Sequence, residues 1–186
     1  MHEQAPARES PEYAEVLSEI FSAYVELSVN RLAADRELGI TPALADCLQF
    51  VYLHGICSVR RIAEGLSITE PAASQLVDRL VRGGLLTRTE DEHDRRLTRV
   101  WLTEKGLEAA SRNRTARQES FARVLSRLDQ QTRKALVSSL EGFLTAALGD
   151  AEEIEKFCKH CGIDHVAYCV LNRAHQAVTG VQMEEY

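Results

Sequence analysis

Three cysteines and a histidine lie close together near the C-terminal end of this 186-residue sequence, in the spacing C-x₂-C-x₃-H-x₃-C. They are Cys158, Cys161, His165 and Cys169. Thiolate and imidazole groups are the ligands that zinc prefers in structural sites, and a C-x₂-C pair can share one ion from a single tight turn. Gly162 follows the pair directly and favours such a turn. The spacing therefore predicts a metal centre held by these four side chains.

The metal and the fourth ligand stay open from the sequence alone. The pattern resembles a zinc knuckle in which both later gaps are one residue shorter than usual, so His175 is an alternative fourth ligand if it shares a helix with Cys169. A histidine inside the motif favours zinc, although three thiolates also suit an iron–sulfur cluster. The alternative to any metal is a set of cysteines on a helical tail that bind none. A structural disulfide is not expected in a reducing cytosol, which leaves metal binding or reversible redox chemistry.

A second group of candidate residues shares one predicted helix, which follows Thr69. Its apolar side chains recur at helical spacing and form one face: Leu76, Val77, Leu80 and Val81. The opposite face is polar and carries Glu70, Ser74, Gln75, Asp78 and Arg79. Serine and glutamine can hydrogen-bond to base edges, and arginine can reach bases or phosphates. This face is therefore suited to the major groove of DNA.

The elements around that helix predict a helix-turn-helix. The stretch 58–66 has helical spacing with Ile62, Ala63 and Leu66 on one face. Thr69 is a good N-cap for the next helix, and Pro71 falls in its first turn, where a missing amide hydrogen costs nothing. Gly83 and Gly84 end it.

A predicted β-hairpin completes the arrangement as a winged helix. Its strands are expected at 85–90 and 96–102, joined by DEHDR. Arg95 and Arg96 lie at its tip. Arginine there suits an adjacent minor groove, whose negative potential attracts cations.

These motifs resemble the multiple-antibiotic-resistance regulator (MarR) family over residues 12–148. DEHDRRLTRVWLTEKG resembles the wing of that family, and EPAASQLVDRLVRGGLLTR resembles its recognition helix. The resemblance implies a dimeric DNA-binding regulator, with part of the first helix in the dimer interface and a ligand pocket near the first two helices. Carried over by motif position, the residues that face bases or nearby phosphates are Ser74, Gln75 and Arg79. Those that hold the DNA backbone are Arg61 and Thr69, and those that act in the wing are Arg95 and Arg96.

Four longer helices are predicted on either side of the winged helix. The first spans 12–37, and the second begins at Thr41-Pro42, buries Leu44, Cys47, Leu48 and Val51, and stops at Gly55. The third begins after Thr103 and runs to about Leu128, with a middle that is polar all round and so bridges two parts of the fold. The fourth follows Asp129 and carries a wide apolar stripe of Leu136, Leu140, Phe143 and Ala147. That stripe favours a homodimer, whose symmetry would match a pseudo-palindromic operator.

The expected fold class is mainly α, a winged helix-turn-helix with long dimerisation helices at both ends. The predicted segments are a flexible tail (1–11), a helical dimerisation region (12–57 and 103–149), a DNA-binding lobe (58–102) and a Cys/His extension (150–186). The chain has a net charge of −6, yet residues 58–117 contain 12 Lys and Arg against 9 Asp and Glu. Positive charge therefore gathers where phosphates would lie. No apolar run is long enough for a membrane span or resembles a signal peptide, so a cytoplasmic location is expected.

The sequence thus predicts a dimeric, sequence-specific transcriptional regulator, expected to be a repressor, that binds double-stranded DNA and no membrane. Control is expected from a small-molecule effector or from zinc or an iron–sulfur centre in the extension. No constellation of catalytic residues is present, so an enzyme is not expected. The alternative is a winged-helix adaptor that binds protein through a zinc-stabilised tail.

Overall fold

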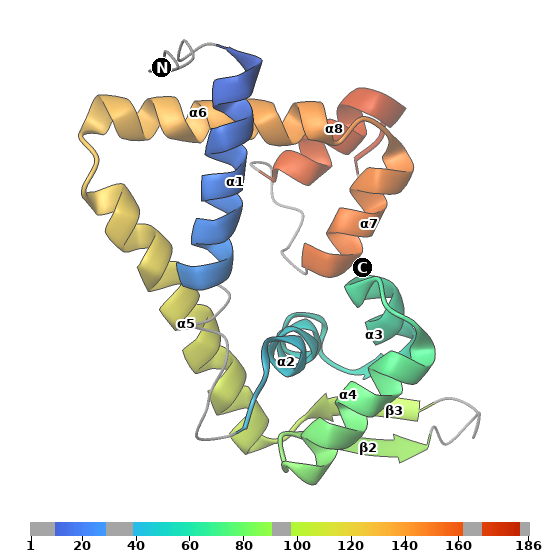
Figure 1. The fold of residues 1–186 in the computed structure, drawn as a ribbon. Coiled ribbons are helices and arrows are strands. Elements are labelled where there is room, and N and C mark those ends of the chain that lie inside the picture. Colours follow the sequence, from blue (N-terminus) through green and yellow to red (C-terminus); the bar gives the residue numbers. More distant parts are fainter. Residues whose placement is uncertain (1–9, 29–38, 91–97, 162–168, 183–186) are drawn as a thin grey trace.

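The computed structural model describes residues 10–28, 39–90, 98–161 and 169–182, which form eight helices and three short strands (Figure 1). In chain order these are α1 (Pro11–Ser28), α2 (Pro42–His54), β1 (Cys57–Ser58), α3 (Val59–Leu66), α4 (Glu70–Arg82), β2 (Leu86–Glu90), β3 (Thr98–Leu102), α5 (Glu104–Ser126), α6 (Gln130–Ala147), α7 (Ala151–Cys161) and α8 (Val170–Thr179). The mainly helical winged-helix fold predicted from the sequence is confirmed. None of the helices in these ranges is long and apolar enough to cross a membrane.

Short-range capping determines where the helices begin. The predicted N-caps Thr41, Thr69, Thr103 and Asp129 each accept a hydrogen bond from the backbone amide three residues on, at 3.5, 3.4, 3.0 and 2.9 Å respectively. Each bond satisfies an amide that has no partner within its own helix. The predicted stop at Gly55 is also confirmed, since this residue ends α2 with a φ of 67°. Of the first predicted helix, α1 accounts for Pro11–Ser28, and residues 29–38 lie outside the described ranges.

One apolar core joins α2 to the helix-turn-helix, the sheet and the first turns of α5. Its most buried side chains include Cys47, Leu48, Val51, Ile62, Ala73, Val77, Leu80 and Val100. The expectation that Cys47 is a core residue is confirmed. The sheet is antiparallel, in the order β1-β3-β2. Val100 of the central strand β3 pairs with Cys57 of β1 on one side and with Arg88 of β2 on the other. The two-residue strand β1 was not predicted from the sequence.

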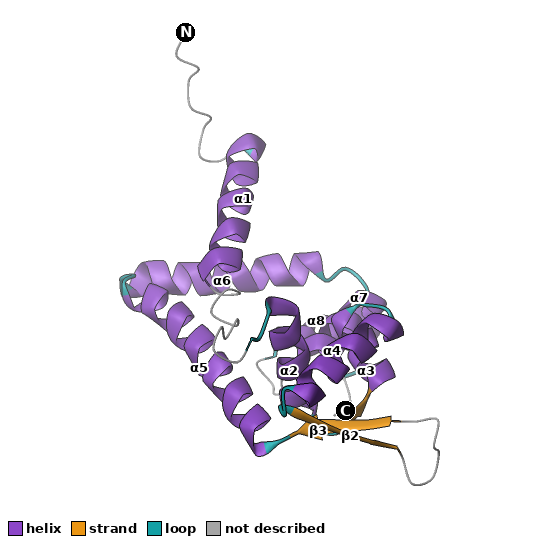
Figure 2. Cartoon of the chain, turned by 60° about the horizontal axis from the view of Figure 1, so that its bottom comes forward, coloured by secondary structure: helices purple, strands orange, loops and turns teal. Residues whose placement is uncertain are grey.

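Helices α2, α3 and α4 and the three strands form one lobe around this core. Helix α5 leads from the lobe to α6, which lies across the opposite end of the molecule (Figures 1 and 2). The predicted apolar stripe of α6 is exposed in the single chain, and Phe143 has 68% of its surface accessible. Helix α1 is also exposed along most of its length, including Ile20 at 61%. Helix α7 then returns from the end of α6 toward α3, and α8 lies back against α6 (Figure 1).

The turn after α4 is held tightly against the start of α5. The Thr103 hydroxyl donates to the backbone oxygens of Gly84 and Leu85, at 2.7 and 3.2 Å, while its oxygen caps α5. The Lys105 ammonium donates to the carbonyl of Gly83 at 3.1 Å. A Cβ atom added at Gly106 would lie 1.9 Å from the carbonyl oxygen of Leu85. Only glycine therefore allows α5 to pack against this turn.

We predict that Gly106→Ala lowers the free energy of unfolding by about 1–3 kcal/mol, because backbone cannot move aside as a flexible side chain can. Gly142→Ala is the matched control: no atom lies within 4 Å of its added Cβ, and the position is inside helix α6. That substitution should leave stability unchanged or raise it by about 0.5–1 kcal/mol. Urea unfolding followed by circular dichroism measures both. Equal stability of the two variants would contradict this account of the α4–α5 junction.

Candidate nucleic-acid interface

Helix α4 separates a buried face from an exposed polar face. Ala73, Val77 and Leu80 are buried in the lobe core, with Leu76 and Val81 partly buried beside them. The outward face carries Ser74, which is half-buried, and the exposed residues Gln75, Asp78, Arg79 and Arg82. With 13 residues the helix is about 20 Å long, which suits insertion into a major groove. The structure therefore brings together three of the predicted DNA-contacting residues, Ser74, Gln75 and Arg79, on one accessible surface.

Helix α3 supports α4 from behind and contributes its own cations. It packs against both α2 and α4, with Ile62 and Ala63 buried and Leu66 half-buried. Arg61 is exposed on α3, and its backbone amide donates to the Ser58 hydroxyl at 3.1 Å.

Thr69 was predicted to hold the DNA backbone, and in the structure its hydroxyl is the N-cap of α4. It accepts a hydrogen bond from the amide of Ala72 and so caps the N-terminus of α4. The side chain is exposed at that position. The cap fixes where the positive end of the α4 dipole lies, and a phosphate near that end would be favoured.

An ion pair, not predicted from the sequence, joins α4 to the wing. The Arg88 guanidinium of β2 donates to the Asp78 carboxylate of α4 at 2.7 Å. Arg88 lies opposite the buried Val100 in the sheet register, so it faces inward toward α4. The alternation of side chains along β2 could have indicated this direction. This exposed pair therefore links α4 to β2 of the wing.

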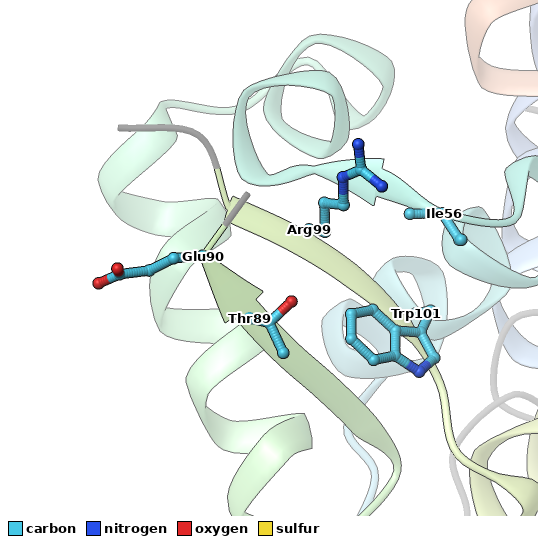
Figure 3. Close-up of a pocket in the computed structure, with 5 residues that line it drawn as sticks. All are labelled: Ile56, Thr89, Glu90, Arg99 and Trp101. Atoms are coloured by element: carbon cyan, nitrogen blue, oxygen red, sulfur yellow. The ribbon is translucent and has the colours of Figure 1, made fainter. Parts of the chain in front are cut away.

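The outer face of the wing carries a shallow cavity of about 410 Å³. Figure 3 shows Arg99 and Trp101 side by side on β3, with Thr89 of β2 and Ile56 beside them, while Glu90 points away. Arg99 is exposed and adds positive charge to the sheet, a second cation that the sequence analysis did not single out. The predicted wing residues Arg95 and Arg96 lie outside the described ranges.

The candidate metal ligands occupy the C-terminal extension, with a local geometry that differs from the prediction. Cys158 and Cys161 do not form a tight turn, because both belong to the last turn of helix α7. Cys169 is the N-cap of α8, and His175 lies within that helix. The tight-turn prediction was wrong because acidic residues in the first turn and an apolar face favour a helix over this stretch, whose Ile154 and Cys158 are buried.

The thiols of the extension influence one another electrostatically. Burial raises the pKa of Cys158 to about 11, and the nearby Cys161 and Cys169 add to the increase. A raised pKa disfavours the thiolate that a metal requires, although a bound metal would itself favour deprotonation. Among the described residues, no group of three or more His, Cys, Asp and Glu side chains is arranged to hold a metal ion.

The histidines of the extension have other contacts or lie outside the description. His165, the favoured fourth ligand, is outside the described ranges, so the four-ligand set stays a prediction. The alternative ligand His175 has its Nδ1 3.0 Å from the carbonyl of Val181, at the end of α8. His160 reaches the lobe, where its Nδ1 lies 2.9 Å from the carbonyl oxygen of Gly65.

Comparisons with known proteins agree with this geometry. Residues 38–97 match the model of the MarR family. The chain is 28% identical to the HTH-type transcriptional repressor MdtR of Bacillus subtilis (strain 168), over 72% of this chain and 83% of MdtR.

Solved structures share the fold. RV1404 from Mycobacterium tuberculosis superposes with a TM-score of 0.66 at 24% identity, over 77% of this chain and 98% of RV1404. Streptococcus pneumoniae FabT in complex with DNA superposes with a TM-score of 0.63 at 16% identity, over 73% of this chain and 95% of FabT.

The curated relatives are transcription regulators and not enzymes, in agreement with the expectation from the sequence. Residues 38–97 thus match the MarR family model, and the chain is similar in sequence and fold to HTH-type transcriptional regulators.

Proposed function

We propose that this protein is a dimeric, sequence-specific DNA-binding repressor in which α4 reads the major groove. The observation that carries the proposal is the division of α4 into a face buried by the lobe core and an exposed face bearing Gln75 and Arg79. A glutamine can make paired hydrogen bonds to adenine, and an arginine to guanine or to phosphate. The role of repressor is proposed because MdtR is described as one.

The distribution of charge supports DNA as the partner. Residues 58–117 carry a net positive charge although the whole chain is at −6. Exposed arginines occur on α3, α4 and β3, namely Arg61, Arg79, Arg82 and Arg99. Phosphate contacts of this kind supply most of the sequence-independent affinity, and acidic flanks limit it. The proposal includes a location in the cytoplasm.

The exposed apolar helices support a homodimer. Helix α1 exposes Val16, Ile20 and Phe21, and α6 exposes Val137 and Phe143. Apolar faces of this extent on two helices need a partner, and a second copy of the chain provides one with closed symmetry. Two recognition helices related by a two-fold axis would then meet two half-sites of a pseudo-palindromic operator.

One cavity is a candidate binding site for a small-molecule effector. It has a volume of about 450 Å³ and lies between α2, α5 and α7. Its lining combines the cationic Arg114 and Arg117 with the acidic Asp46 and the apolar Phe50 and Leu53. An acidic, partly aromatic effector fits this combination, because arginine pairs with carboxylate while the apolar walls cover a ring.

We predict that Gln75→Ala relaxes sequence preference at a single position of the operator. Loss of one bidentate base contact removes about 1–3 kcal/mol of discrimination against the wrong base pair. Competition binding against operators changed one base pair at a time measures this. Gln131→Ala, at an exposed residue in the first turn of α6, is the matched control and should leave the preference unchanged. An unchanged preference in Gln75→Ala would contradict insertion of this face into the groove.

We predict that an Arg95→Ala/Arg96→Ala double variant binds operator DNA more weakly, with a salt dependence whose log–log slope is smaller by about 2. Each arginine that contacts a phosphate displaces roughly one counterion, so its removal also removes that salt dependence. Gel shifts with DNA from upstream of the protein's own gene, over a series of salt concentrations, give both quantities. Lys156→Ala, exposed on α7, is the control.

The same gel shifts separate the regulator from the adaptor alternative. Retardation by the wild-type chain that fades with rising salt supports the regulator. If the wild-type chain shifts no such DNA under anaerobic, metal-replete conditions, the adaptor is favoured. Equal binding by wild type and the Arg95/Arg96 variant would contradict the role given to the wing.

The metal centre of the extension is proposed on the sequence spacing, with Cys158, Cys161, Cys169 and His165 as ligands. We predict that anaerobically purified protein contains a single bound zinc per chain, and that a Cys158→Ser/Cys161→Ser double variant loses it. An iron–sulfur cluster would instead show iron and visible absorption that air bleaches. Elemental analysis and an absorption spectrum distinguish the two, with Cys47→Ala as the control outside the extension. Absence of both metals from the wild-type chain would refute the site.

A further inference from the structure

The C-terminal extension is attached to the rest of the chain at two separate places. Helix α8 packs against α6, helix α7 packs against α8, and α7 also packs against α3 of the helix-turn-helix. Figure 1 shows α6 across the top, with α5 descending to the lobe on one side and α7 on the other. The extension therefore provides a second connection between α6 and the lobe, in addition to α5.

The attachment to α6 is apolar and well buried. Leu148, directly after α6, packs with Ile154 and Cys158 of α7 and with Ala174 of α8, and Ile154 has no accessible surface. An ion pair between Arg173 of α8 and Glu141 of α6 lies beside this cluster. Because the buried groups come from α7, from α8 and from the residue that follows α6, α7 and α8 are fixed in direction relative to the end of α6.

The attachment to the lobe is a polar contact with a rigid acceptor. The Nδ1–H of His160 donates to the carbonyl oxygen of Gly65 at 2.9 Å, across 95 positions of sequence. Gly65 itself is buried, and a Cβ atom there would lie 2.0 Å from the ring of Phe50. Phe50 is in turn 2% exposed and stacks on His54, with ring centroids 4.2 Å apart. The carbonyl that receives His160 is therefore held in place by the lobe core.

Helix α5 alone holds the lobe less firmly. It is 23 residues long, about 35 Å, and its middle is largely polar and at most half-buried. Its first turns pack against the core through Gly106, Ala109 and Ala110, and in its second half only Ser120 is buried. A second connection, through α7 on another side of the lobe, restricts the position of the lobe relative to α6 more than α5 does by itself.

We propose that α7 and α8 act as a brace that couples the position of the helix-turn-helix to the dimerisation helix α6. The firm end of the brace is the Leu148–Ile154 cluster with the Arg173–Glu141 pair, and the docking end is the His160–Gly65 hydrogen bond. Helix α3 packs directly on α4, so displacement of α7 from α3 moves or loosens the recognition helix. In a dimer the brace sets the distance between two recognition helices. This consequence rests on the proposed function, whereas the coupling within one chain does not.

The first test compares His160→Ala with His160→Asn in the full-length chain. Asparagine places an amide N–H where the imidazole Nδ1–H lies, so it keeps the donor, while alanine removes it. Hydrogen–deuterium exchange of peptides covering α3 and α7 should speed up about 2- to 10-fold in His160→Ala, the range expected for loss of one hydrogen bond. His160→Asn should stay near wild type. Exchange in His160→Ala that equals wild type would overturn the docking.

The second test asks whether the two ends of the brace communicate. Arg173→Glu breaks the pair with Glu141, and Arg173→Glu combined with Glu141→Arg restores it with reversed charges. The single variant should speed exchange in α3, far from the substituted residue, and the double variant should reverse that change. Faster exchange confined to α8, with α3 as in wild type, would overturn the brace even though the extension is loosened.

The third test reads out the effect on DNA. The wild-type chain is compared with His160→Ala on operators whose half-site spacing is changed by one or two base pairs. We expect the wild-type chain to discriminate between spacings, and His160→Ala to discriminate about 2- to 10-fold less. Equal discrimination would overturn the brace. Failure of the wild-type chain to bind any DNA would instead reject the proposed function, and the exchange measurements would still decide the coupling within the chain.

Discussion

The burial of one face of α4 is the constraint on which the rest of the structure depends. Val77 and Leu80 are removed from water by α2, α3 and the sheet, and this burial leaves Gln75 and Arg79 on the opposite side. An apolar stripe that is not covered would itself seek a partner, and the polar face could not then be presented in a defined direction. The core therefore both stabilises the lobe and sets the direction of the exposed polar face of α4.

The parts of the fold that were predicted correctly are those specified by neighbouring residues. Caps such as Thr69 and Thr103 act across three residues, and helical spacing identified the buried Val77 and Leu80. Such interactions are local, so a single sequence contains all the information needed. The same reasoning placed the exposed face of α4 correctly. For this reason the candidate site was visible in the sequence before its packing was known.

The features that were missed depend on residues far apart in the chain. Strand β1 exists because Cys57 pairs with Val100, and Arg88 reaches Asp78 only once the wing folds back on α4. The C-x₂-C motif was assigned to a turn, since metal spacing in isolation does not show that Ile154 and Cys158 share an apolar helical face. Contacts of this kind need the tertiary fold, and no window of sequence contains both partners.

The extension changes how the motion of a winged helix can be controlled. The relatives compared above match between 72% and 77% of this chain but at least 83% of their own lengths, so part of this chain has no counterpart in them. Without α7 and α8, α5 is the described connection from α6 to the lobe. The proposed brace adds a second connection through α7, and the cavity lined by Arg117 and His160 lies directly beside its docking end. A molecule bound in that cavity would contact α5 and α7 where both helices meet the lobe. Effector binding would therefore act on the same contacts as the brace.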